Sequence, residues 1–459
     1  METELSFYNE AVERGGTVRD PYKPLWETLE LLGPGLFVEK RTRAEEKLRK
    51  LGATFPLPND PAGKDRVLPA DWIPRIIPRD HWEKLSAGLL QRGRAINAWL
   101  VDLYNGDQDI VPEEIVRSSA FCYPYPLPDY SVPFPVHVYG PDVVHLGAGE
   151  YVVLEDNVRV PSGVAYSEAI RQALSTVMGE MFSPYHASDI FAYYEMLRAS
   201  LETAAPPGIE DPVIALVSSG LDDSAFFEHR QIAKTCDVHL LTFDDLRVRD
   251  GEVVAKSDGR MINVIYRRFE EGHLKTRFPE LEDLYLASKV NIVNALGVGV
   301  ADDKAVFPYV PVMIERYLEE KPLLKNVRTL SPAEPEERQE VLDRLDELVL
   351  KPREGAGGQG ILIGPEAARE DLERARRDLK KNPTNFVAQE SLDFSTHIVG
   401  EPFSGADEFE EAYIDLRAFV LPAVGYVMPG GLTRVASPGT RVVNSSAGGS
   451  FKDTWVLED

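Results

Sequence analysis

The feature that most constrains this chain is a glycine-rich loop between two apolar runs, LVLKPREGAGGQGILIG at residues 348–364. Within it, Gly355, Gly357 and Gly360 form a G-x-G-x-x-G. In the dinucleotide-binding fold such a loop leads directly into a helix. Here the β-rich ILIGP follows, and the helical EAAREDLERARRDLKK comes only after it. The pattern predicts a hairpin whose backbone N–H groups cover a phosphate, with a plain glycine-rich turn as the alternative.

The lysine beside this loop, Lys351, precedes the glycines. In the Walker pattern a Lys-Ser/Thr pair follows the last glycine, and none follows here. In protein kinases the lysine comes on a later strand. Neither of these phosphate-binding classes therefore fits the order of residues in this chain.

The charge and the cysteines limit the classes of partner. The formal net charge is −25, from 75 acidic and 50 basic residues, so a nucleic-acid binder is disfavoured, as is binding to an anionic membrane. Two cysteines far apart in the sequence indicate neither a disulfide framework nor a zinc site. The first residues do not resemble a signal peptide, and no run of 18 apolar residues occurs. We expect a cytoplasmic protein.

The first part of the chain, to about residue 116, has mainly helical periodicity, with DWIPRIIPRD as a proline-punctuated connector. A Pro/Tyr-rich segment at 117–135 marks a boundary. Two strand-like runs then flank a turn at Gly147 to Gly149, and a helical region covers roughly 166–204. From residue 212, strand, helix and strand patterns alternate and predict a small doubly wound α/β unit. LSPAEPEERQE, near 330–340, is predicted to be a linker or a helix entry.

With these segments in place, the loop resembles the lid of the ATP-grasp superfamily, in which a lysine precedes the glycines. Three more stretches match that family in order: DDKAVFPYV with Asp303 and Lys304, FVAQESL at 386–392, and DLRAFVL at 415–421. The family's metal-binding segment should follow them, but it lies upstream, in YGPDVV and VVLEDNVRVPSG. The chain therefore resembles the circularly permuted ATP-grasp proteins, which include glutathionylspermidine synthase relatives and carboxylate–amine ligases.

The resemblance implies a role for each of several residues. The metal ligands would be Asp142, Glu155 and Asn157. The nucleotide would contact Lys304, Lys351, Glu354, Gly355, Gly357, Gly358, Gly360, Gln389 and Glu390. The γ-phosphate and the developing acyl phosphate would be held by Arg417 and Arg434, with Asn444 and Lys452 as further candidates. The acceptor pocket would be bounded by Arg159, Ser162 and Gly163. For each residue the alternative is a structural hydrogen bond, a tight turn or a surface charge.

Physical chemistry supports the metal trio. Residues two apart in a strand face the same side, so Glu155 and Asn157 project together while Asp156 points away. Two facing carboxylates are unfavourable without a cation, and magnesium prefers oxygen ligands that also include phosphates. The role of Arg353 and Glu354 at the start of the loop is left open between triphosphate binding and contact with a cationic substrate.

The predicted fold class is α+β: a circularly permuted ATP-grasp fold with an N-terminal helical region and a small α/β domain resembling a pre-ATP-grasp domain. Four domains are expected. They are a helical region at 1–116, a permuted metal-binding segment at 117–205, the α/β domain at 206–300, and a nucleotide-binding domain with its lid at 301–459.

The resemblance implies an ATP-dependent ligase that forms an amide or peptide bond through an acyl phosphate. Its cofactors would be ATP and Mg²⁺, with two ions expected and Mn²⁺ as a substitute. Its substrates would be a small carboxylate donor, such as an amino acid or peptide, and an amine acceptor. A homodimer is left open. The alternatives are a phosphotransferase of the same fold and a non-catalytic nucleotide-binding partner protein.

Overall fold

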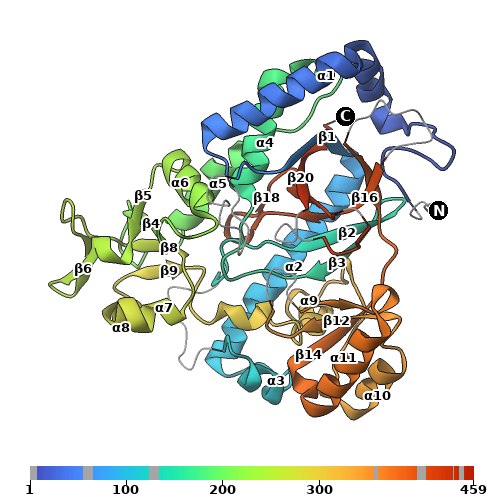
Figure 1. Cartoon of the computed structure of the whole chain (residues 1–459). Coiled ribbons are helices and arrows are strands. Elements are labelled where there is room, and N and C mark those ends of the chain that lie inside the picture. Colours follow the sequence, from blue (N-terminus) through green and yellow to red (C-terminus); the bar gives the residue numbers. More distant parts are fainter. Residues whose placement is uncertain are drawn as a thin grey trace.

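The computed structural model of the chain describes residues 8–54, 66–122, 134–355, 360–400, 410–437, 439–443 and 449–458 (Figure 1). Gly357, Gly358 and Asn444 lie outside the described residues. No helix among the described residues is both long and apolar enough to cross a membrane.

An eight-stranded sheet forms the centre of the molecule, in the order β1-β20-β19-β16-β2-β3-β10, with β15 also paired to β16. Its strands are β1 (Ala70–Ile77), β20 (Ser450–Val456), β19 (Leu432–Val435), β16 (Glu410–Arg417), β2 (Asp142–Gly147), β3 (Glu150–Glu155), β10 (Lys325–Asn326) and β15 (Thr396–Val399). Because β16 pairs with β2, the C-terminal strands and the hairpin near residue 150 belong to one sheet. A circularly permuted chain order requires this pairing, because it places the upstream, predicted metal-binding segment beside the C-terminal strands.

The predicted connector DWIPRIIPRD is wrong, because most of it is strand β1. Strand β1 runs parallel to β20 at the edge of the sheet, and the register shifts between Asp71 and Arg75. Proline lacks a backbone N–H, and an edge strand with a bulge tolerates that loss. Pro74 therefore fits within a strand that is almost wholly buried.

The predicted hairpin and its turn are confirmed. Strands β2 and β3 pair antiparallel, and Asp142 lies opposite Glu155. Gly147 and Gly149 have φ of 103° and 74°, which glycine adopts without the steric cost of a Cβ atom. The turn thus brings the start of β2 and the end of β3 to the same end of the sheet.

The glycine-rich loop joins two antiparallel strands, as predicted. It belongs to a second sheet, β11-β14-β12-β13, which lies at the lower right of Figure 1 with two helices. The elements are β11 (Thr329–Leu330), β14 (Phe386–Glu390), β12 (Leu348–Pro352), β13 (Leu362–Ile363), α10 (Pro335–Asp343) and α11 (Arg369–Lys381). A separate small apolar core, which includes Leu330, Leu348 and Leu379, holds this unit together.

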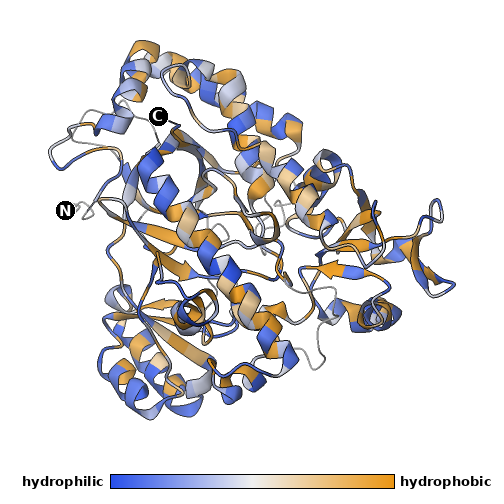
Figure 2. Ribbon diagram, turned by 180° about the vertical axis from the view of Figure 1, so that it is seen from behind, coloured by the Kyte–Doolittle hydropathy of each residue, from blue (hydrophilic) through white to orange (hydrophobic). Residues whose placement is uncertain are grey.

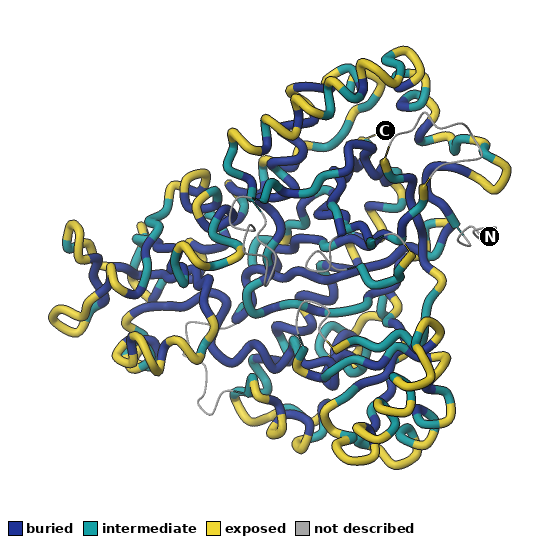
Figure 3. The backbone as a smooth tube through the Cα atoms, in the orientation of Figure 1, coloured by how far each residue is buried: buried dark blue, intermediate teal, exposed yellow. Residues whose placement is uncertain are grey.

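The predicted α/β unit contains a four-stranded parallel sheet in the order β5-β4-β8-β9. Its elements are β4 (Ile214–Ser218), α6 (Phe226–Thr235), β5 (His239–Thr242), β8 (Val264–Arg268), α7 (Gly272–Arg277), α8 (Pro279–Leu286) and β9 (Asn291–Val293). A hairpin of β6 (Leu246–Arg249) and β7 (Glu252–Ala255) projects from its outer edge; residues 247–251, which include its turn, are exposed, and most of β7 is buried (Figure 3). Strand β5 lies on one side of β4 and β8 on the other, so the connections switch direction between β4 and β8.

The remaining helices of the described residues are α1 (Lys23–Leu51), α2 (Arg79–Asn105), α3 (Glu113–Ser118), α4 (Val164–Val177), α5 (Ala192–Glu202) and α9 (Val310–Leu318), and a short ribbon adds β17 (Val420–Leu421) and β18 (Tyr426–Val427). Helix α4 packs on β19 and β20 of the central sheet, α1 packs on α4, and α9 packs on α2. Figure 2, seen from behind, shows α2 running diagonally across one face of the molecule. The helical region predicted at 166–204 is two helices, separated at 178–191 by a short turn-rich segment.

Candidate functional site

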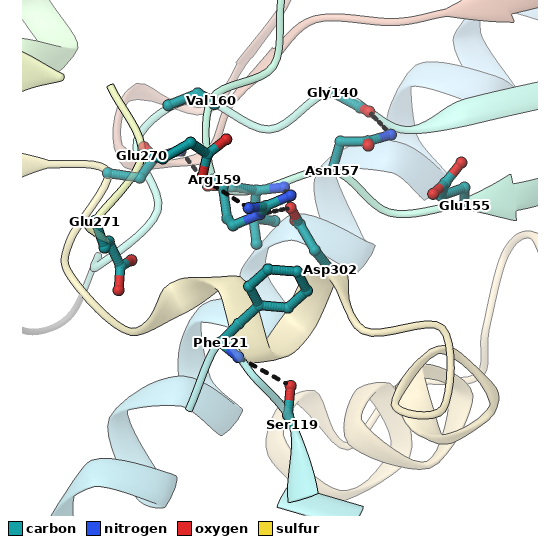
Figure 4. Close-up of polar contacts among 12 residues, drawn as sticks. Ser119, Phe121, Gly140, Glu155, Asn157, Arg159, Val160, Glu270, Glu271 and Asp302 are labelled. Atoms are coloured by element: carbon teal, nitrogen blue, oxygen red, sulfur yellow. Dashed lines mark hydrogen bonds and ion pairs between the residues drawn. The ribbon is translucent and has the colours of Figure 1, made fainter. Parts of the chain in front are cut away.

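The three predicted metal ligands lie together at one end of the β2–β3 hairpin. Asp142 begins β2 and is paired across the sheet with Glu155, the last residue of β3. Asn157 follows, and its Nδ2 donates to the carbonyl oxygen of Gly140 at 3.0 Å (Figure 4). Asp156 points the other way and is buried, with both oxygens 2.7 Å from the guanidinium of Arg92 on α2. The alternation of the strand therefore presents Glu155 and Asn157 on one face, as predicted.

Two arginines converge on Asp142. Arg417 Nε and Nη2 donate to its two oxygens at 2.7 and 2.6 Å, and Arg434 Nη2 lies 2.9 Å from Oδ2. Arg434 also forms a two-pronged pair with Asp415, at 2.9 and 2.5 Å. Burial alone would raise the pKa of Asp142, but the two guanidinium groups outweigh it and hold the pKa at about 2. The carboxylate therefore stays ionised, and both arginines stay fixed beside it.

Two lysines complete the cluster, Lys304 from the segment after β9 and Lys351 from β12. Lys304 Nζ lies 2.8 Å from Glu155 Oε1 and donates to the carbonyl oxygen of Gly355, also at 2.8 Å. Gly355 is the first glycine of the glycine-rich loop. Burial lowers the pKa of Lys351, and the charges of Glu155, Lys304, Asp142 and Arg434 all act on it. The base of the glycine-rich loop and the β2–β3 hairpin thus share one cluster of charges.

Of the three predicted magnesium ligands, Glu155 and Asn157 have an oxygen available for a metal ion, whereas the oxygens of Asp142 are already bonded. Among the described residues, neither Glu155 Oε2 nor Asn157 Oδ1 accepts a hydrogen bond, so both oxygens are available as ligands. The oxygens of Asp142 already accept bonds from two arginines. No group of three or more His, Cys, Asp or Glu residues in the described part of the chain could hold a metal. A magnesium ion here would need phosphate oxygens or water for its remaining ligands.

Arg353 and Glu354, at the start of the loop, both contact other parts of the chain. Arg353 is buried, with its Nε 2.6 and 2.8 Å from the two oxygens of Asp303, and it also donates to Ser118 Oγ at 2.8 Å. Glu354 Oε1 accepts from the backbone N–H of Ala120 at 3.1 Å. Both side chains therefore fasten the start of the loop to α3 and the residues after it.

Gln389 and Glu390 end strand β14 close to the hairpin. Gln389 Nε2 donates to the carbonyl oxygen of Leu154 at 3.2 Å, so it links the second sheet to β3. The carboxylate of Glu390 pairs with Arg344 at 3.0 Å and with Arg328 at 2.9 Å. Their assignment to adenine and ribose stays a prediction. Lys452, a weaker candidate, is fully buried and pairs with Asp71.

Arg159 lies two residues beyond Asn157, beside the α/β unit (Figure 4). Its Nε donates to Asp302 Oδ2 at 2.7 Å, and its Nη1 donates to Glu270 Oε2 at 2.8 Å. The guanidinium carbon lies 4.1 Å from the centre of the Phe121 ring. Phe121 and Glu270 belong to no motif, and Asp302, which opens the DDKAVFPYV stretch, was assigned no role, so sequence reasoning missed all three. Only the position of Asp302, directly before the Asp303–Lys304 pair, could have pointed to one of them.

The turn after Arg159 is held by the α/β unit. Glu228 on α6 accepts from the backbone N–H groups of Gly163 and Ala165, at 2.7 and 3.1 Å, at the start of α4. Arg268 at the end of β8 donates to Ser162 Oγ and pairs with Glu228 at 3.2 Å. Ser162 and Gly163, two of the residues predicted to bound the pocket for the amine acceptor, are therefore held in place by the buried Glu228–Arg268 ion pair of the α/β unit.

Comparison with known proteins gives a consistent picture. The sequence profile described as "Circularly permuted ATP-grasp type 2" matches residues 74–436. Uncharacterized protein sll0335 of Synechocystis sp. is 38% identical over 473 residues, covering 99% of this chain and 97% of its own. A Frankia casuarinae protein named "Putative glutamate--cysteine ligase 2-2" is 38% identical over 98% of this chain, which spans 53% of that protein.

Among solved structures, a glutathione synthetase-like effector (GSS30) from Globodera pallida, in its apo form, superposes with a TM-score of 0.57. The superposition covers 93% of this chain and 98% of that one at 12% identity, so it shows a shared fold. The resemblance drawn from the lid and the displaced metal segment is confirmed. The chain belongs to the circularly permuted ATP-grasp type 2 family.

Proposed function

We propose that the protein is an ATP- and magnesium-dependent ligase that joins a carboxylate to an amine through an acyl phosphate. The donor would be an amino acid or a small peptide. The observation that carries the proposal is the meeting of four distant segments in one charge cluster. They contribute Asp142 and Glu155, Lys304, Lys351, and Arg417 with Arg434. A structural salt bridge would need one pair, whereas a triphosphate needs several cations placed together.

The chemistry follows from the charges. An oxygen of the substrate carboxylate attacks the γ-phosphorus of ATP, and ADP leaves. The amine then attacks the acyl carbon, loses a proton to solvent, and expels phosphate that carries the attacking oxygen. Lys304 and Lys351 would neutralise the triphosphate, and the guanidinium groups of Arg417 and Arg434 would hold the transferred group. Their carboxylate partners orient these arginines before any substrate binds.

Magnesium would be held by Glu155 and Asn157, whose oxygens are available, with Asp142 as the third ligand. When bound, it would neutralise negative charge on the phosphate groups of ATP. Two ions, or Mn²⁺ in their place, remain part of the proposal. Asp142 would be the weakest of the three ligands, because its oxygens already accept from Arg417 and Arg434.

The test is release of ADP and phosphate from ATP with mixtures of amino acids and amines. Glutamate with cysteine is the first pair to try, since it occurs in the name of the Frankia relatives. A ligase releases ADP only when donor and acceptor are both present. Release with one substrate would support a phosphotransferase instead. Binding of ATP without turnover under any mixture would support a non-catalytic nucleotide-binding protein.

A further inference from the structure

The guanidinium of Arg159 has two carboxylate partners of unlike character. Asp302 is buried, with 12% of its side chain exposed, and it also accepts from the backbone N–H of Val158 at 2.5 Å. The side chain of Glu270 is 54% exposed, and among the described residues its carboxylate pairs with Arg159 alone. Asp302 is therefore a permanent part of the fold. An exposed, singly bonded pair such as Arg159–Glu270 contributes little to stability, so Glu270 can be replaced as a partner at small cost.

The position of Arg159 itself is fixed. Phe121 covers one face of the guanidinium at 4.1 Å (Figure 4). Gly299 leaves room for the side chains of Arg159 and Phe121. A Cβ atom at Gly299 would lie 2.6 Å from Arg159 Cδ and 2.9 Å from Phe121 Cβ. The side chain of Arg159 is only 17% exposed. A cation that is held this rigidly and largely removed from water binds an added anion with little loss of side-chain entropy.

The location of the pair also points to a ligand. Glu270 follows the carboxyl end of β8, next to the point where connections switch direction between β4 and β8. In open parallel sheets, ligands bind in the crevice outside such a point. Arg159 lies four residues beyond Glu155, which is at most about 13 Å along an extended chain. A molecule the size of an amino acid or dipeptide can span that distance.

We propose that Glu270 stands in for a carboxylate of the substrate, which displaces it and binds to Arg159. The group bound is the carboxylate that the reaction does not consume. The substrate class is accordingly an amino acid or short peptide with a free carboxylate, as donor or as acceptor. This inference rests on the proposed function, which assigns the other group of the same substrate, its carboxylate or its amine, to the ligation reaction. Exchanging one carboxylate for another keeps the charge around Arg159 unchanged and returns Glu270 to water.

The proposal predicts that removing a carboxylate from the site strengthens substrate binding. If Glu270 competes with the substrate, then Glu270→Ala removes the competitor and tightens binding, by about threefold to tenfold for one exposed ion pair. If Glu270 instead contacts the ammonium group of the substrate, the same change weakens binding. Glu83→Ala is a matched control. Glu83 also pairs with one arginine, Arg79, at 2.7 Å, and is 62% exposed, at the start of α2.

The experiment is calorimetric titration of wild type, Glu270→Ala and Glu83→Ala with each of the twenty standard amino acids. It is run with and without Mg²⁺ and a non-hydrolysable ATP analogue. We expect at least one amino acid to bind more tightly to Glu270→Ala and to be unchanged in Glu83→Ala. The gain should vanish for the corresponding carboxamide and in the double variant Arg159→Met/Glu270→Ala. Arg159→Lys, which keeps the charge without the planar fork, should retain part of the wild-type affinity.

Three results would overturn the inference: weaker binding by Glu270→Ala, a gain that persists without Arg159, or no binding of any amino acid by either protein. Failure of the ATP analogue to bind wild type would contradict the proposed function. The titration without nucleotide would still report on Arg159 in that case. Once a reaction is found, KM is measured for the carboxylate substrate and for the amine substrate in Glu270→Ala. The substrate whose KM falls is the one whose free carboxylate binds to Arg159.

Discussion

Two regions of the candidate site are built differently: the cluster of Asp142, Arg417 and Arg434, here called the phosphate side for its proposed ligand, and the surroundings of Arg159. On the phosphate side, Asp142 is buried and each of its two arginines has a defined partner before any ligand binds. On the Arg159 side, one partner is permanent and the other is exposed. The difference matches what each side would have to bind. ATP is the same in every turnover and suits a preorganised site, whereas a site for a variable substrate benefits from a replaceable contact.

The largest expected effect is on the phosphate side. We expect Glu155→Gln to lower kcat for ADP release by about a hundredfold to a thousandfold, because it removes a charge that positions Lys304 and the metal. The fold should persist, since Glu155 is half-buried at the end of its strand. Glu150→Gln is the matched control, at the other end of β3 and paired with Lys325 at 2.7 Å. A variant Glu155→Gln as active as this control would remove Glu155 from the site.

The next effect concerns nucleotide affinity. Lys351→Ala should raise the Kd for ATP by about tenfold to a hundredfold, since it removes a charge-assisted contact with the triphosphate. Equilibrium binding of a fluorescent ATP analogue measures this change directly. The exposed Lys325 offers a control, Lys325→Ala, that should leave the Kd unchanged. Equal affinity in the two variants would mean that the lid is misassigned.

A third prediction concerns the pH dependence of stability on the phosphate side. The pKa of Asp142 is about 2 in the folded chain, below its ordinary value of 3.8. Its ionisation therefore stabilises the folded state above pH 4, and that contribution is lost as the pH falls through 2. It amounts to about 2 kcal/mol. In urea unfolding between pH 5 and pH 3, the advantage of wild type over Asp142→Asn should shrink as the pH falls. A constant difference would show that Asp142 is not held by its arginines.

The smallest effect is expected at Glu390. Its carboxylate already pairs with Arg344 and Arg328, so one hydrogen bond to ribose would change little. Glu390→Gln should raise the Kd for ATP by about threefold. Measurement with GTP alongside ATP separates ribose contact, which both nucleotides share, from base contact. A loss larger than that in Lys351→Ala would place the nucleotide nearer to Glu390 than the cluster of charges suggests.

Features set by local sequence patterns could be predicted, whereas contacts between distant segments could not. The turn at Gly147 to Gly149, the loop between β12 and β13, and the shared face of Glu155 and Asn157 follow from local patterns, and the structure has each of them. The partners of Arg159 could not be predicted. Phe121, Glu270 and Asp302 come from three separate segments, and only the packing of the α/β unit against the hairpin joins them.

Strand β1 was missed for another reason. Its prolines are typical of a connector, and an edge position with a bulge is visible only in the sheet. The role of Arg353 was left open for a similar reason. A charged residue beside a glycine-rich loop is compatible with phosphate binding, and the buried pair that Arg353 forms with Asp303 is visible only in the structure. Local sequence therefore picked out candidate residues that the structure brings together, but it did not identify the residues that hold them in place.

The most direct test of the central claim follows one oxygen atom. Once ADP release identifies the carboxylate substrate, that substrate is labelled with ¹⁸O in the reacting carboxylate, and the released phosphate is analysed by mass spectrometry. Through an acyl phosphate, one labelled oxygen passes from the carboxylate to each phosphate when the amine displaces it. We therefore predict one ¹⁸O per phosphate released. Phosphate without label, formed alongside the amide product, would contradict the account.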